Sequence, residues 1–144
     1  MLFISWLIRY GHVLGAAVWV GGYALLAFFI VPLISKGAGE TLAQLAINSV
    51  RILTYAGTLT IGFGIVLITK TNGFVNLIGT PWGTCIIAGI VIAVALLGIG
   101  DGALRPAIRR VARGEKAPAR LWAIIGFALT VLAVGLMTAA TYVG

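Results

Sequence analysis

The chain contains a single histidine, His12, and it lies inside the apolar stretch RYGHVLGAAVWVGG of residues 9–22. A neutral imidazole is a common axial ligand of heme iron, and ionisable residues inside apolar membrane segments often mark functional sites. If the stretch is helical, His12 lies two turns after Trp6, about 9 Å below the membrane interface. Gly15 and Ala16 share its helical face, so a flat group could approach the imidazole. The sequence therefore makes His12 the candidate ligand of a b-type heme.

Arg9 and Met137 are candidates for the same site. Arg9 precedes His12 by one helical turn, and its guanidinium could bind a heme propionate, a lipid phosphate, or extend to the headgroups without any ligand. Met137, counted inward from Tyr142, falls near the depth of His12 and could be a second axial ligand, or it could fill the core. A heme held by two histidines of one chain is excluded, because there is only one.

A structural role for His12 is the alternative hypothesis, in which its ring forms a hydrogen bond across a helix interface. Hydrolytic and nucleotide chemistry are excluded because the sequence offers no serine, histidine and acid set and no phosphate-binding loop. The single cysteine, Cys85, excludes an intramolecular disulfide. We therefore do not expect the chain to be an enzyme by itself.

The elements that position these residues follow from composition. Of the 144 residues, 61% are hydrophobic and 9% are charged, which indicates a membrane protein. No segment alternates with the period of a strand, so the spanning elements must be helices. Four charge-free stretches have lengths close to the roughly 20 residues that are needed to cross a bilayer: 10–35, 52–69, 71–100 and 121–144. We predict a single all-α domain over residues 1–144, a polytopic bundle of four transmembrane helices.

Local signals suggest where these helices begin and end. Thr80 followed by Pro81 is typical of a helix N-cap and first turn, whereas Pro106 is expected to end or kink the third helix near Arg105. The expected helices are Leu2 to Ile34, Thr41 to Thr69, Pro81 to Arg105 and Pro118 to Tyr142.

The charges are distributed asymmetrically. Ten basic and three acidic residues give a net charge of +7, which must lie mostly in loops, so it indicates no nucleic-acid surface. The positive-inside rule then predicts that the basic 105–120 loop is cytoplasmic, that both termini lie outside, and that the protein resides in the plasma membrane of a prokaryote. The loop could also bind anionic lipids or an acidic partner. With alternating helices, eight basic residues fall on one side: Lys36, Arg51, Arg105, Arg109, Arg110, Arg113, Lys116 and Arg120.

The first apolar stretch, LIRYGHVLGAAVWVGGYALLAFFIVPLI, resembles the first helix of a superfamily of small four-helix membrane proteins. That superfamily includes CopD-like copper-resistance domains and HemJ-type protoporphyrinogen oxidases. The shared pattern is an early histidine followed by small residues and a W-x-G-G motif, matched here by His12, Trp19, Gly21 and Gly22. The segment GTPWGTCIIAG, residues 79–89, occupies the place of a family tryptophan before the third helix.

The resemblance implies a heme held by the early histidine and, in HemJ-type enzymes, by a lysine of the third helix. This chain has Thr84, Cys85 and Ile86 where that lysine is expected, so protoporphyrinogen oxidation is not predicted. For CopD-like proteins the resemblance implies copper handling, which requires several soft ligands. The soft donors of this chain are few and scattered: His12, Cys85, Met1 and Met137.

The leading hypothesis is a small integral membrane subunit that binds heme b through His12 and works beside other membrane subunits of a respiratory or other redox complex. The alternatives are a purely structural subunit without a cofactor and a copper-handling membrane protein.

Overall fold

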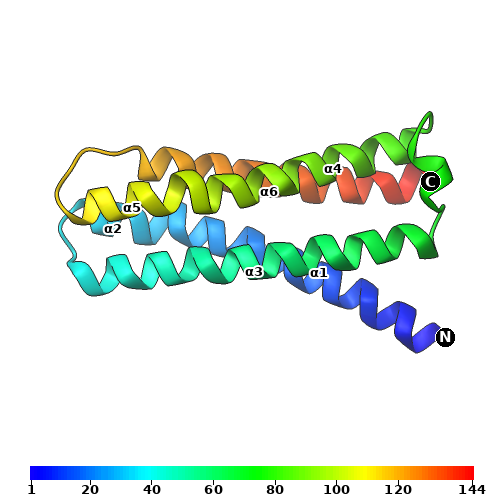
Figure 1. Cartoon of the computed structure of the whole chain (residues 1–144), viewed down its shortest axis with the longest axis horizontal. Coiled ribbons are helices and arrows are strands. Elements are labelled where there is room, and N and C mark those ends of the chain that lie inside the picture. The colour runs from blue at the N-terminus through cyan, green and yellow to red at the C-terminus, as the bar shows by residue number, and fades with distance from the viewer.

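The computed structural model describes all residues from Met1 to Gly144, and it contains helices and loops without strands (Figure 1). Four helices are long and apolar enough to span a membrane: Leu2–Ser35, Glu40–Lys70, Pro81–Ala112 and Ala119–Val143. The prediction of an all-α bundle of four membrane helices is confirmed. The expected bounds of the first, second and fourth helices agree with the structure to within about one residue, which is the ordinary uncertainty of a helix end.

Short π-helical segments interrupt two of these helices. In chain order the elements are α1 (Leu2–Leu25), π-helical η1 (Leu26–Ile30), α2 (Val31–Ser35), α3 (Glu40–Lys70), the 3₁₀ turn η2 (Phe74–Leu77), α4 (Pro81–Gly98), π-helical η3 (Ile99–Leu104), α5 (Arg105–Ala112) and α6 (Ala119–Val143).

The bundle consists of two helix pairs. α1 packs most extensively on α3, and α4 packs most extensively on α6. Both termini lie at one end of the bundle, which we call the terminal end, and toward this end α1 diverges from the other helices (Figure 1). The loops 36–39 and 113–118 lie at the opposite end, which we call the basic end.

The prediction that Pro106 ends the third helix near Arg105 is wrong, because the helix continues to Ala112. Proline removes one N–H donor, and its ring presses on the carbonyl group four residues earlier. Here the π-helical segment η3 precedes the proline, and the Arg105 N–H donates to the Gly100 carbonyl, five residues back. The wider turn changes the hydrogen-bond register just before the proline and lets the helix continue.

The first helix passes Pro32 in the same way. The π-helical segment η1 precedes it, and the Val31 N–H donates to the Leu26 carbonyl, again five residues back. Both long helices that run from the terminal end to the basic end therefore accommodate a proline near the basic end.

The largest buried cluster joins the two helix pairs around Tyr23, whose side chain is 1% exposed. The Tyr23 hydroxyl donates to the Leu96 carbonyl over 3.2 Å. Leu96 lies just before η3, where the Ile99 N–H donates to both the Ala95 and the Leu96 carbonyls. The tyrosine thus supplies a second donor at the point where the helical register changes. Its ring lies against Gly126 of α6, where a Cβ atom would collide with it.

Two helical intervals indicate how the bundle sits in a bilayer. Arg51 and Lys70 on α3 are about 19 residues apart, and Pro81 and Asp101 on the third helix about 20, so each interval covers about 28–30 Å. This matches the roughly 30 Å hydrocarbon core of a bilayer. We therefore place the hydrocarbon between these levels, so the segments 40–50 and 102–112 project beyond it at the basic end.

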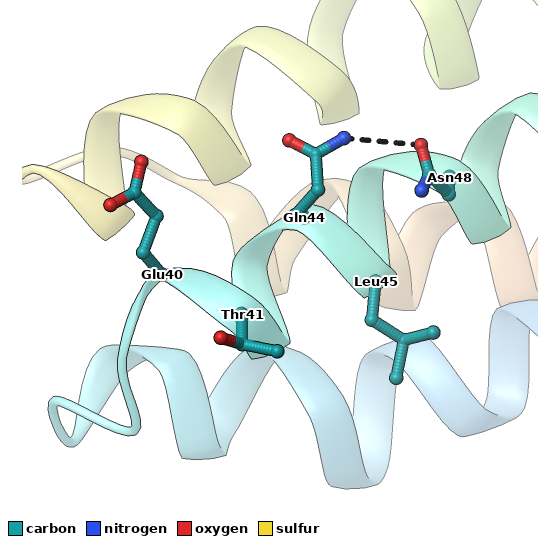
Figure 2. A pocket seen from close by; sticks show the side chains of 5 residues that line it. All are labelled: Glu40, Thr41, Gln44, Leu45 and Asn48. Atoms are coloured by element: carbon teal, nitrogen blue, oxygen red, sulfur yellow. Dashed lines mark hydrogen bonds between the residues drawn. The ribbon is translucent and has the colours of Figure 1, made fainter.

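The projecting start of α3 carries several exposed polar side chains. Figure 2 shows its polar side chains around a shallow surface depression, where Gln44 donates to Asn48 over 3.1 Å. Glu40 and Thr41 lie one turn earlier on the same surface and are exposed. Polar side chains at these positions are consistent with an aqueous environment at the basic end.

Candidate functional site

His12 lies on α1 and is half-buried against α3. Its Nδ1 atom is 2.8 Å from the carbonyl oxygen of Thr60. Because a carbonyl only accepts hydrogen bonds, Nδ1 must carry the proton, and Nε2 of the neutral ring then carries a lone pair. Nε2 forms no hydrogen bond and is not among the buried atoms that lack a partner, so it keeps some accessible surface. The nitrogen that could bind a ligand is therefore free.

The imidazole rests on Gly64 of α3. A Cβ atom at Gly64 would lie 3.0 Å from Cε1 and 3.3 Å from Nδ1 of His12. Two turns further along α1, the indole ring of Trp19 lies on Gly57 in the same way, and a Cβ there would collide with it. The two helices are antiparallel, so His12 and Trp19 are seven residues apart on α1, and their partners Gly64 and Gly57 are seven residues apart on α3. Glycines of α3 thus provide the room for ring side chains of α1.

The contact with Thr60 places His12 near the middle of the membrane. Thr60 is about nine residues from Arg51 and about ten from Lys70, which corresponds to about 14–15 Å in each direction. Counting from Trp6 gives a shallower depth of about 9 Å, because that count takes the interface to lie at Trp6. An ionisable side chain at this depth is energetically costly. Such residues usually have a function, or their polar atoms form hydrogen bonds within the protein.

Arg9 is exposed on the same helix, one turn toward the terminal end, and it forms neither an ion pair nor a hydrogen bond. None of the chain's side-chain carboxylates lies in the terminal half of the bundle. Glu40 begins α3, and the other two side-chain carboxylates have basic partners: Asp101 with Arg105 at 2.6 Å, and Glu115 with Arg110 at 3.0 Å and Arg113 at 3.2 Å. Arg9 therefore has no side-chain counter-ion within its own chain.

Met137 is half-buried on α6, and its terminal methyl group fills the space above Gly89 of α4. His12 is anchored on α3, so the two expected ligands contact different helix pairs. These contacts of Met137 are those of a side chain that fills the core.

The loop at the basic end is held by ion pairs. The hydrogen bond from Arg110, helped by the nearby charge of Arg113, holds the pKa of Glu115 below its usual value. The glutamate is ionised at neutral pH and compensates part of the positive charge at this end of the bundle. No chemistry beyond charge compensation follows from this contact.

No group of three or more histidine, cysteine, aspartate or glutamate side chains gathers around one point of the structure. A copper site built from such side chains would lack ligands here. Heme needs only one or two axial ligands from the protein, and His12 with a free Nε2 satisfies that requirement.

Comparison of the chain with models of known families, with curated proteins and with solved structures finds no match. The resemblance of the first helix to CopD-like and HemJ-type proteins therefore stays a prediction. Sequence reasoning found His12 but missed its two neighbours on α3. Gly64 could have been noticed in the glycine-rich stretch of α3, whereas the Thr60 carbonyl, a backbone atom, has no sequence signal.

Proposed function

We propose that this protein is a small membrane subunit that binds heme b through Nε2 of His12. The observation that supports this proposal is the hydrogen bond from Nδ1 to the Thr60 carbonyl. Histidines that bind metals commonly donate their other ring N–H to a carbonyl or carboxylate, which fixes the tautomer and increases the basicity of the ligating nitrogen.

A bound heme would supply one-electron transfer, with a potential set by its ligands and surroundings. In this proposal Thr60 orients the imidazole, and the surrounding apolar helices exclude water from it. Arg9, which has no side-chain counter-ion of its own, would bind a heme propionate one turn closer to the terminal end. Met137 has no assigned role at the iron, because it occupies the space above Gly89.

The proposed orientation follows the charge asymmetry. The basic end carries eight of the ten basic residues, so it faces the cytoplasm of a prokaryotic cell and both termini face outside. Because the chain offers no catalytic set of its own, we propose that it exchanges electrons with other membrane subunits of a respiratory or other redox complex.

A structural subunit without a cofactor is the second candidate function. The same hydrogen bond supports it, since His12 joins α1 to α3 at a depth where water offers no competing partner. In this case the free Nε2 has no role, and an asparagine that keeps the interhelical hydrogen bond should replace His12 without loss.

Heme titration of the purified protein distinguishes the two functions. Wild type is expected to bind one equivalent with a Soret shift typical of ligated heme, and His12→Ala and His12→Asn are expected to lose it. Cys85→Ala, at a half-buried position in another helix, is the control and should bind as wild type does. Equal binding by wild type and His12→Ala would overturn the assignment of the ligand.

A further inference from the structure

We infer that Gly64 is a positioning residue for His12: its missing side chain lets the imidazole reach the Thr60 carbonyl and so determines which ring nitrogen is free. The use of that free nitrogen rests on the proposed function, but the positioning itself can be tested without any cofactor.

The geometry of α3 explains why residue 64 decides the approach. In an α-helix the carbonyl of Thr60 also accepts the N–H of residue 64, one turn later. A carbonyl oxygen has two lone pairs, so it can accept a second donor that approaches beside this helical bond. The ring of His12 does so by passing over Gly64, with Cε1 and Nδ1 at 3.0 and 3.3 Å from the position of a Cβ atom.

An alanine at position 64 would occupy that space. Contacts of 3.0 to 3.3 Å are too short for carbon and nitrogen atoms, so the ring would have to move by a few tenths of an ångström. The movement would lengthen the 2.8 Å hydrogen bond from Nδ1 and weaken the preference for this tautomer. The helix itself would not suffer, since alanine favours helices more than glycine does.

Gly62 offers a matched control on the same helix. A Cβ atom there would meet nothing within 4 Å, so Gly62→Ala changes the same residue type two positions away without touching the imidazole. Any difference between the two alanine variants therefore reports the contact with His12 rather than the general effect of removing a glycine.

The single histidine makes the experiment direct, because protein labelled with ¹⁵N-histidine has only one pair of imidazole nitrogen signals. We would record them without heme, in lipid nanodiscs and at a pH where the ring is neutral. Wild type and Gly62→Ala are expected to show one tautomer protonated at Nδ1. Gly64→Ala is expected to show a mixture of the two tautomers and, on heme titration, an affinity about tenfold or more weaker than that of Gly62→Ala.

The outcomes separate this inference from the proposed function. A proton on Nε2 in wild type, or identical nitrogen signals in all three proteins, would overturn the positioning role, and the first of these results can be obtained even if Gly64→Ala fails to fold. A tautomer change in Gly64→Ala with no heme binding by any protein would support the positioning role and reject the heme. Heme binding by all three proteins together with identical nitrogen signals would reject the positioning role and support the heme.

Discussion

The hydroxyl group of Tyr23 joins α1 to the third helix at the point where that helix becomes π-helical. We expect Tyr23→Phe to remove this hydrogen bond while it keeps the packing of the ring. The loss should lower the free energy of unfolding by about 0.5–1.5 kcal/mol, the usual net contribution of one hydrogen bond. Denaturant unfolding in detergent measures it, and a variant as stable as wild type would show that the bond contributes nothing.

The Tyr23 ring also rests on Gly126 of α6. Gly126→Ala should overpack this buried contact and cost about 1–3 kcal/mol of stability. Gly135→Ala on the same helix is the matched control, because a Cβ there meets nothing within 4 Å. We expect the control to be as stable as wild type or slightly more stable, in the same unfolding assay. Equal stability of the two variants would contradict the close packing described for Tyr23.

At the scale of single residues, sequence reasoning found the candidate ligand and missed its surroundings. His12 stood out because it is the only imidazole in an apolar segment. The partner at Thr60 could not be predicted, because it depends on the register between α1 and α3 and involves a backbone atom. The position of Met137 above Gly89 depends in the same way on how α4 and α6 pack.

At the scale of elements, the expected cap of the third helix is present, because the Gly83 N–H donates to the Thr80 hydroxyl over 3.0 Å. Thr80→Ala should therefore cost about 1 kcal/mol of stability. Thr80→Ser keeps the oxygen and should cost much less. The comparison of the three proteins by denaturant unfolding tests the cap, and equal losses in both variants would assign the effect to packing of the threonine methyl group instead.

The ends of the helices could be predicted where a local signal decides them, as at Thr80 and Pro81. The effect of Pro106 could not, because a proline ends a helix unless the preceding turn changes its hydrogen-bond register. The π-helical segment η3 makes that change here, so the helix passes the proline that propensity alone predicts to end it.

At the scale of the whole molecule, the composition was sufficient to predict four membrane helices, because few charged residues interrupt the apolar stretches. The divergence of α1 toward the terminal end could not be predicted (Figure 1). It depends on packing between helix pairs, which hydropathy does not describe.

The proposed orientation can be tested by cysteine labelling in a Cys85→Ser background. We expect Asn76→Cys, in the loop at the terminal end, to react with a membrane-impermeant maleimide in intact spheroplasts. Lys116→Cys, in the loop at the basic end, should react only after the membrane is opened, because the cationic loop stays in the cytoplasm. The opposite pattern would contradict the orientation.

Optical spectra of protein from its native membrane test directly whether His12 binds a heme. Reduced-minus-oxidised absorption spectra would be recorded for wild type and His12→Ala, each purified in mild detergent from the native membrane with its partners retained. We expect a b-type heme band in wild type that is lost in His12→Ala. The absence of such a band in wild type, or an equal band in both proteins, would contradict it.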